Sequence, residues 1–294
     1  MSETQITKWT TRLLLDWMTE QFTVTKIENP RLIGEMLLTY VLGGARIDLY
    51  AHADRVATDA ERNTLRELVQ RAMKHEPVQY IVGTAWFFGI EFQVNSSTLI
   101  PRTCTERLVE QVIAHCNPST ESSFHIAEIG TGSGCIAITL ARNMEHARIV
   151  ATDISNEALE LAQANTAIQK VETQISFLQG DGVDPLLDLG LFDVVCSNPP
   201  YIPDCEMTQL AANVLDWEPK LALSGGKDGM DVISQIITKA PRILKPNGLL
   251  IIEIATSTMN QALALVQDEP SFEEAKIIRD AFGDERFLRA IRRA

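Results

Sequence analysis

Residues 125–135 read HIAEIGTGSGC, and this stretch decides the fold. The largely apolar segment His125–Ile129 predicts a buried strand, and a helix is expected to begin at Cys135, directly after a glycine-rich turn. Glycine at positions 130, 132 and 134 permits a tight turn and lets a ligand approach the backbone closely. The G-x-G-x-G spacing differs from the G-x-G-x-x-G of dinucleotide-binding turns, so by itself it fits a plain strand-to-helix turn equally well.

Four more short apolar runs follow this turn: RIVATDI (148–154), QISFLQG (174–180), FDVVCSN (192–198) and GLLIIEI (248–254). Helical stretches such as NEALELAQANTAIQ separate them, which implies right-handed crossovers and a parallel sheet covered on both faces. The last two runs, EAKIIRD and ERFLRAIR, lie close together along the chain and predict an antiparallel edge. The sequence therefore predicts an α/β domain over 105–294.

The chain before this domain has a different pattern. Apolar residues recur at helical spacing from about Ile6 to His75, and the third of these segments opens with Thr58 or Asp59 as a helix cap. Near-alternation between Val78 and Val94, in QYIVG and AWFFGIEFQV, predicts a β-hairpin. We therefore expect a helical substrate-recognition domain at 1–76 and a β-hairpin linker at 77–104.

Composition limits the class of protein. The chain has 294 residues, a mass of 32.7 kDa and a mean hydropathy near zero, which is typical of a globular protein. It has no apolar run of roughly 18 residues, as a membrane span needs, and no secretory signal, so we expect a cytoplasmic protein. The net charge of −13 disfavours non-specific binding to nucleic acid. Five cysteines without a C-x-x-C pair, and five scattered histidines, indicate reduced thiols and no metal site.

Carboxylates follow the second and third predicted strands of the α/β domain. Asp153 can accept hydrogen bonds from both ribose hydroxyls of an adenosine, and Asp181, between Gly180 and Gly182, can meet the adenine amino group. Each has a plainer interpretation, Asp153 as a helix cap and Asp181 as a loop residue. The carboxyl ends of parallel strands meet at one edge of an open sheet, where ligands bind. We therefore interpret these positions as one pocket.

The fourth strand ends in Asn198, Pro199, Pro200 and Tyr201. The prolines lack a backbone N–H, so the turn presents carbonyl oxygens together with the amide oxygen of Asn198. Each proline also restricts the residue before it to an extended conformation, which holds the acceptors in place. The turn therefore predicts a site that accepts protons from a planar NH2 group, with Tyr201 offering a ring face. A proline-terminated strand with a buried tyrosine is the alternative.

These positions outline a pocket for S-adenosylmethionine. The predicted cofactor contacts are Gly130, Thr131, Gly132, Ser133, Gly134, Asp153, Asp181, Gly182 and Asn198. The predicted catalytic and substrate-binding residues are Asn198, Pro199, Pro200 and Tyr201.

The ordered set GTGSG, TDIS, GDG and NPPY resembles the class I S-adenosylmethionine-dependent methyltransferases. The resemblance implies a Rossmann-like, seven-stranded sheet with a reversed last hairpin, and NPPY implies the branch that methylates amide or exocyclic amino nitrogens. More narrowly, PVQYIVG (77–83), LIPR (99–102) with Thr105 and Glu106, WEP (217–219) and LSGGKDG (223–229) resemble the HemK/PrmC family.

That resemblance implies an enzyme that methylates the side-chain nitrogen N5 of the glutamine in the Gly-Gly-Gln motif of peptide chain release factors. The helical domain would then help to hold the release factor. Three departures from the family pattern stand out: Thr103 and Cys104 replace a proline and a glutamate, Gly182 replaces an aromatic residue, and Ala255 replaces a glycine. We therefore expect something other than an aromatic side chain at position 182 to cover adenine.

Other functions remain open at this stage. The first is N5-glutamine methylation of a large-subunit ribosomal protein, and the second is N6-adenine DNA methylation, which the acidic charge disfavours. A third is cofactor binding without methyl transfer, as in a sensor. We expect a monomer without direct nucleic-acid contacts.

Overall fold

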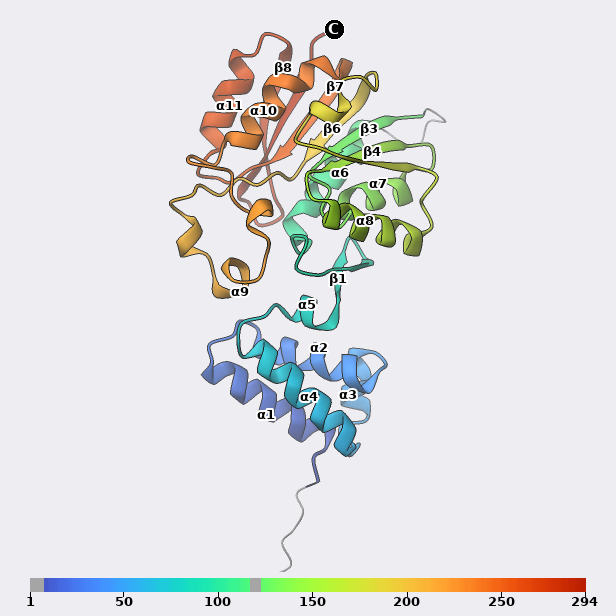
Figure 1. The fold of residues 1–294 in the computed structure, drawn as a ribbon, viewed down its shortest axis with the longest axis vertical. Helices are drawn as coiled ribbons and strands as arrows, with labels where there is room; N and C mark the ends of the chain where they lie inside the picture. The colour runs from blue at the N-terminus through green and yellow to red at the C-terminus, as the bar shows by residue number, and fades with distance from the viewer. Residues whose placement is uncertain (1–7, 117–122) are drawn as a thin grey trace, which may run out of the picture. The chain divides into compact units, whose positions relative to one another are not determined.

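The computed structural model describes residues 8–116 and 123–294. The chain forms two compact units, one of residues 1–83 with 212–217 and one of 84–211 with 218–294 (Figure 1). Within the described residues, no helix is long and apolar enough to cross a membrane.

The first unit is helical, as predicted. Its helices are α1 (Thr11–Val24), α2 (Pro30–Leu42), α3 (Arg46–Ala51), α4 (Asp59–Ala72), α5 (Val78–Val82) and α9 (Ala212–Leu215). Thr58 caps α4, since its hydroxyl accepts from the Glu61 N–H at 3.2 Å and the Glu61 carboxylate accepts from the Thr58 N–H at 2.8 Å. The start of the first predicted helix, at Ile6, lies outside the described residues.

The predicted β-hairpin is confirmed only in its second part. Strands β1 (Thr84–Phe87) and β2 (Ile90–Gln93) pair antiparallel. The segment before them, which includes QYIVG, was predicted as a strand, and that prediction is wrong because Val78–Val82 forms the short helix α5. Val78 and Ile81, three residues apart, are both buried in the helical core, and Gly83 ends the turn with a φ of +78°.

The second unit contains the predicted seven-stranded sheet. Its strands are β3 (His125–Ile129), β4 (Arg148–Asp153), β5 (Ile175–Gln179), β6 (Phe192–Ser197), β7 (Leu244–Glu253), β8 (Phe272–Arg279) and β9 (Glu285–Arg292). They lie in the order β5-β4-β3-β6-β7-β9-β8. The first five of these are parallel, and β9 pairs antiparallel with both β7 and β8, which confirms the reversed last hairpin.

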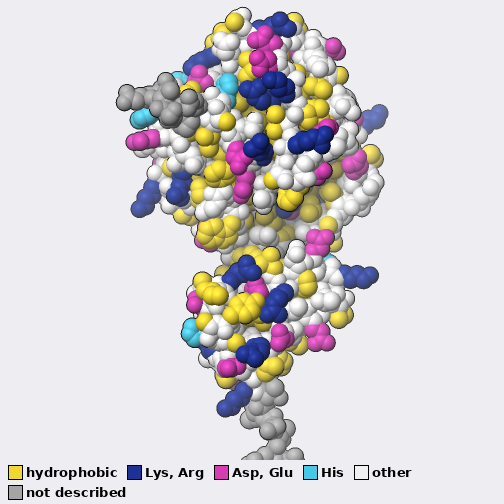
Figure 2. Space-filling model, turned by 180° about the vertical axis from the view of Figure 1, so that it is seen from behind, with side chains coloured by type: hydrophobic (Ala, Val, Ile, Leu, Met, Phe, Trp, Pro, Cys, Tyr) yellow, Lys and Arg dark blue, Asp and Glu magenta, His cyan; other side chains and the backbone are white. Residues whose placement is uncertain are grey.

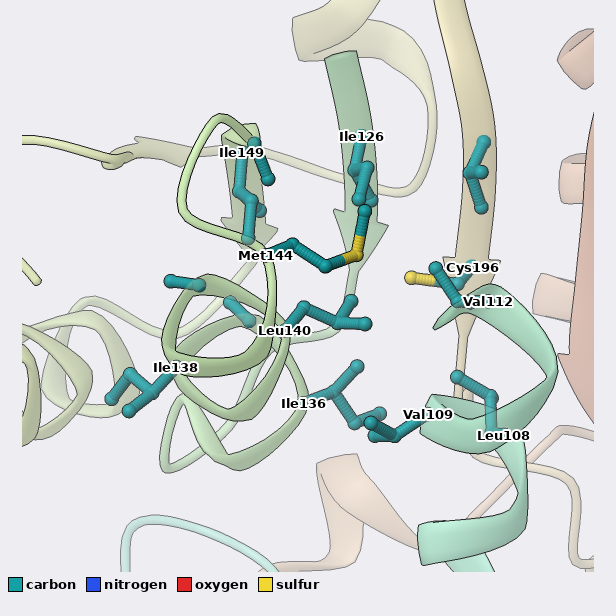
Figure 3. Packing of buried hydrophobic residues seen from close by; sticks show 14 of the residues in the cluster. Leu108, Val109, Val112, Ile126, Ile136, Ile138, Leu140, Met144, Ile149 and Cys196 are labelled. Atoms are coloured by element: carbon teal, nitrogen blue, oxygen red, sulfur yellow. The ribbon is translucent and has the colours of Figure 1, made fainter. Parts of the chain in front are cut away.

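Helices cover both faces of this sheet (Figure 1). On one face lie α6 (Glu106–Cys116), α7 (Cys135–Asn143) and α8 (Asn156–Gln169), and on the other lie α10 (Asp231–Lys239) and α11 (Met259–Asp268). Short 3-10 turns connect the elements: η1 (Thr103–Thr105), η2 (Asp184–Leu186), η3 (Met207–Gln209), η4 (Lys220–Ala222) and η5 (Ala240–Arg242). Figure 3 shows Val112 of α6 beside Cys196 of β6, and Met144, which follows α7, beside Ile126 of β3.

The strand order fixes where a ligand can bind. From β3 the chain proceeds outward through β4 and β5, and it then returns to place β6 on the other side of β3. The connections therefore diverge between β3 and β6, and such a switch point opens a crevice at the carboxyl ends of the strands.

Candidate active site

A cavity of about 340 Å³ lies at these strand ends. The predicted residues that line it are Gly130, Thr131, Gly132, Ser133, Asp153, Asp181, Gly182, Asn198, Pro199 and Pro200. Two predicted residues, Gly134 and Tyr201, are not among the lining residues. The structure thus brings together most of the residues that the sequence singled out from four separate strands.

The glycine-rich turn is tied to the neighbouring strand through Asp153. The Gly132 N–H donates to Oδ2 of Asp153 at 2.9 Å, and the Ser155 N–H donates to Oδ1 at 3.0 Å. Burial raises the pKa of Asp153, and the backbone N–H donors oppose this rise. A carboxylate has about four acceptor positions, so Asp153 retains capacity for ligand hydroxyls. Ser155, rather than Asp153, caps α8 by accepting from the Ala158 N–H at 3.1 Å.

Gly132 and Gly134 have different structural roles. Both adopt positive φ, +55° and +82°. A Cβ on Gly132 would come no closer than 4.0 Å to another residue, Thr98, and would project into the cavity. A Cβ on Gly134 would lie 3.0 Å from Cδ1 of Ile138 and 3.2 Å from Cβ of Ala162. Gly132 therefore leaves room for a ligand, whereas Gly134 lets α7 pack against α8.

This difference predicts opposite phenotypes for two matched substitutions. Gly134→Ala is expected to destabilise the protein by about 2 kcal/mol or more, because overpacking adds to the left-handed backbone strain. Gly132→Ala incurs mainly the backbone strain, about 1 kcal/mol, but is expected to weaken binding of S-adenosylmethionine. Urea unfolding and calorimetric titration measure the two effects. Equal losses of stability in both variants would contradict the assignment.

The acceptors of the NPPY turn meet the cavity. The side chain of Asn198 donates through Nδ2 to the Thr105 hydroxyl at 3.2 Å, and Asn198, Pro199 and Pro200 line the cavity. Among the described residues, none donates a hydrogen bond to the carbonyl oxygen of Pro199 or Pro200. That these carbonyl oxygens accept hydrogen bonds from a ligand stays a prediction.

Tyr201 directly follows the lining residue Pro200 but does not itself line the cavity. Its ring packs against the apolar core on the α10 face, and its hydroxyl donates to Oε1 of Glu253 at 3.4 Å. Burial raises the pKa of the Tyr201 hydroxyl. In this structure Tyr201 therefore holds the end of the NPPY turn in place through its ring packing and its contact with Glu253.

Two further segments of the lining were not predicted as site residues. They are 97–102, apart from Ile100, and part of 219–222, and the buried carboxylate of Glu218 ties them together. Glu218 forms an ion pair with Arg102 and accepts from the Ile100 N–H at 3.2 Å. The motifs LIPR and WEP were the available signal, but no sequence spacing relates two segments more than a hundred residues apart.

Gly182 faces a side chain of α10. A Cβ at position 182 would lie 1.6 Å from Oε1 of Gln235, and Val232 from the same helix lines the cavity. Gln235 thus occupies the space that a larger side chain at 182 would need. What covers adenine in place of an aromatic side chain at 182 stays a prediction.

Glu128, at the end of β3, is fully buried beneath the glycine-rich turn. Its Oε2 accepts from the Thr131 hydroxyl at 2.8 Å and from the Ala137 N–H at 3.1 Å. Its Oε1 has no partner among the described residues, and burial raises the pKa of Glu128 to about 8. The carboxyl group therefore holds a proton at neutral pH.

The raised pKa of Glu128 predicts a pH-dependent stability. The folded state keeps this proton up to about pH 8, whereas the unfolded chain loses it near its ordinary pKa of 4.5. The stability that this group contributes is thus fully present below about pH 4.5 and is lost as the pH rises to about 8. Over this range the free energy of unfolding falls by at most about 1.4 kcal/mol per pH unit. Glu128→Gln should remove this slope in urea unfolding between about pH 5 and 8. An unchanged slope would contradict the buried protonated carboxyl.

Comparison with known proteins agrees with this architecture. The family model of the PrmC N-terminal domain matches residues 14–83, and that of the methyltransferase small domain matches residues 104–227. A release factor glutamine methyltransferase of Rhodopirellula baltica is 36% identical over 96% of both chains. One of Geobacter sulfurreducens is 38% identical over 87% of this chain and 88% of its own. A methyltransferase structure from Pyrococcus furiosus shares the fold, with 18% identity, a TM-score of 0.51, and coverage of 79% of this chain and 98% of its own.

The sheet order and the matching domain define the class of the protein as a class I methyltransferase. The two relatives, which match 96% and 87% of this chain, are both release factor glutamine methyltransferases. The chain belongs to the release factor glutamine methyltransferase family, which confirms the resemblance to the HemK/PrmC family.

Proposed function

We propose that this chain transfers a methyl group from S-adenosylmethionine to the side-chain amide nitrogen N5 of the glutamine in the Gly-Gly-Gln motif of peptide chain release factors. Family membership supports the reaction. One observation supports the site: the acceptor-rich turn of Asn198 and Pro199 lines the same cavity as the glycine-rich turn and Asp153. An acceptor-lined site suits a substrate nitrogen with two protons and disfavours a hydroxyl.

The residues that line the cavity suit S-adenosylmethionine in two respects, an acceptor for hydroxyl groups and free space beside the backbone. Asp153 retains acceptor capacity for ribose hydroxyls, and Gly132 leaves the space that a Cβ would fill. When bound, the cofactor supplies an electrophilic methyl group on its sulfonium sulfur. Residues 130–133 are then proposed to hold it through the backbone, and the exposed Asp181 is proposed to reach the adenine amino group.

The protein residues are proposed to act mainly by orienting the glutamine. Its nitrogen is a weak nucleophile because the lone pair is delocalised into the carbonyl group. Oδ1 of Asn198 accepts a hydrogen bond from one N–H of the glutamine amide, and the Pro199 carbonyl accepts one from the other N–H. These two bonds raise the electron density on nitrogen and aim it at the methyl group. Asn198 cannot take up a proton at accessible pH, so the proton passes to solvent as or after the methyl group moves.

We also propose that the helical domain, residues 1–76, helps to hold the release factor. The enzyme is further proposed to act as a monomer in the cytoplasm, without direct nucleic-acid contacts. On the face seen in Figure 2, Lys and Arg side chains are interspersed with Asp and Glu. A continuous basic stripe, as nucleic-acid binding uses, is not visible on that face.

A substrate panel tests the proposal. The purified chain is incubated with labelled S-adenosylmethionine and, in parallel, with a release factor, a large-subunit ribosomal protein and an adenine-containing oligonucleotide. Label is expected in the release factor alone. Label in the ribosomal protein or the oligonucleotide instead would contradict the proposed substrate, and cofactor binding without any transfer would favour a sensor.

A further inference from the structure

A buried carboxylate lies beside the NPPY turn and accepts a hydrogen bond from its Tyr201 hydroxyl. Glu253, the last residue of β7, has no exposed surface. Its Oε2 accepts from the Thr105 hydroxyl at 2.7 Å, and its Oε1 accepts from the Tyr201 hydroxyl at 3.4 Å and from the Cys104 thiol at 3.7 Å. All three groups donate to Glu253, so both of its carboxyl oxygens act as acceptors in this structure.

The polarity of these hydrogen bonds determines how Asn198 is oriented. A hydroxyl has a single proton, and that of Thr105 goes to Glu253, so its oxygen can only accept from a further neighbour. The neighbour is the Asn198 side chain at 3.2 Å, which must therefore turn its NH2 group toward Thr105. The amide oxygen Oδ1 is then the end that remains for the cavity.

We propose that Thr105 and Glu253 are positioning residues that fix which end of the Asn198 amide faces the substrate. This inference rests on the proposed methyl transfer to a planar amide. The two ends of an asparagine amide have nearly the same shape, so sterics alone select weakly between them. In the reversed orientation the Asn198 NH2 would face the substrate NH2, and two donors would meet without an acceptor.

The geometry around Glu253, and not its charge, supports this role. Burial raises the pKa of Glu253, and the Thr105 hydrogen bond and the positive charge of Arg286 reduce this rise. Glu253 is adjacent to the acceptor turn only in the fold, because it lies 148 residues after Thr105 and 52 after Tyr201.

Three substitutions test the inference. Thr105→Val keeps the shape but removes the hydroxyl, and it is expected to lower kcat for release-factor methylation by about tenfold or more, because Asn198 loses its fixed orientation. Thr105→Ser keeps the hydroxyl and should stay within about threefold of the wild type, an estimate based on the same positioning effect. Cys104→Ala is the matched control, since it removes another donor to Glu253 but leaves the Thr105 arm intact. The affinity for S-adenosylmethionine, measured by calorimetry, should remain unchanged in all three.

Equal kcat values in Thr105→Val and Thr105→Ser would overturn the inference, while activity of the wild type would still support the proposed function. A second measurement does not depend on methyl transfer. In the unliganded wild type, the Asn198 side-chain NH2 signal, assigned by its loss in Asn198→Ala, should exchange slowly with solvent because it faces Thr105. Exchange as fast as that of an exposed asparagine would overturn the inference even if no methyl transfer were detected.

Discussion

Asn198→Ala is expected to lower the rate of methyl transfer by about a hundredfold or more, which is the loss typical of removing one positioned polar group from a transition state. The Asn198 NH2 group contacts Thr105, so the side-chain oxygen Oδ1 is the proposed acceptor, and alanine has no replacement for it. The Pro199 carbonyl remains, so one of the two proposed acceptors survives. The loss should therefore appear in kcat, with binding of S-adenosylmethionine changed little.

Single-turnover kinetics with a release factor and labelled cofactor measure this effect, and calorimetry measures cofactor binding on the same sample. Thermal unfolding serves as the control, because Asn198 also contacts Thr105 and its loss could disturb the turn. Near-normal transfer by a folded Asn198→Ala variant would refute the role of the side chain.

Asp153→Ala is the second substitution with a large expected effect, and here the loss should be in cofactor binding. The carboxylate holds the Gly132 N–H at 2.9 Å and is proposed to accept from the ribose hydroxyls. A hydrogen bond to a charged group contributes about 1.5–3 kcal/mol, so the affinity for S-adenosylmethionine should fall by at least about tenfold, and by about a hundredfold if both ribose bonds are lost.

Saturating cofactor should restore much of the rate in Asp153→Ala, which distinguishes it from Asn198→Ala. The exposed Asp181 offers a comparison, since Asp181→Ala removes a carboxylate from the same cavity but with more access to water. We expect a smaller loss of affinity there. An unchanged affinity in Asp153→Ala, measured calorimetrically, would contradict the proposed ribose site.

The parts of the site that could be predicted from sequence are local. The glycine-rich turn, Asp153 and Asn198 each stand directly at the end of an apolar strand, and parallel strands bring their ends to one edge. The position of each residue directly after its strand was therefore enough to predict that these residues meet. Likewise, the capping of α4 by Thr58 depends on residues only three positions apart.

The parts that could not be predicted depend on long-range packing. Val78–Val82 has a strand-like composition, yet it forms α5 because Val78 and Ile81 are buried in the helical core. Gly134 and Gly132 belong to one repeated pattern, and their roles differ because Ile138 of α7 and Ala162 of α8 crowd only Gly134. The pairing of Glu218 with Arg102 likewise joins residues 116 positions apart, which no local pattern encodes.

The position of the transferred methyl group tests the central claim most directly. A full-length release factor is treated with the wild-type chain and S-adenosylmethionine, digested, and mapped by tandem mass spectrometry. One methyl group on the side-chain nitrogen of the glutamine in Gly-Gly-Gln is the predicted result. A methyl group at any other residue, or an unmodified glutamine with a folded and cofactor-bound enzyme, would contradict it.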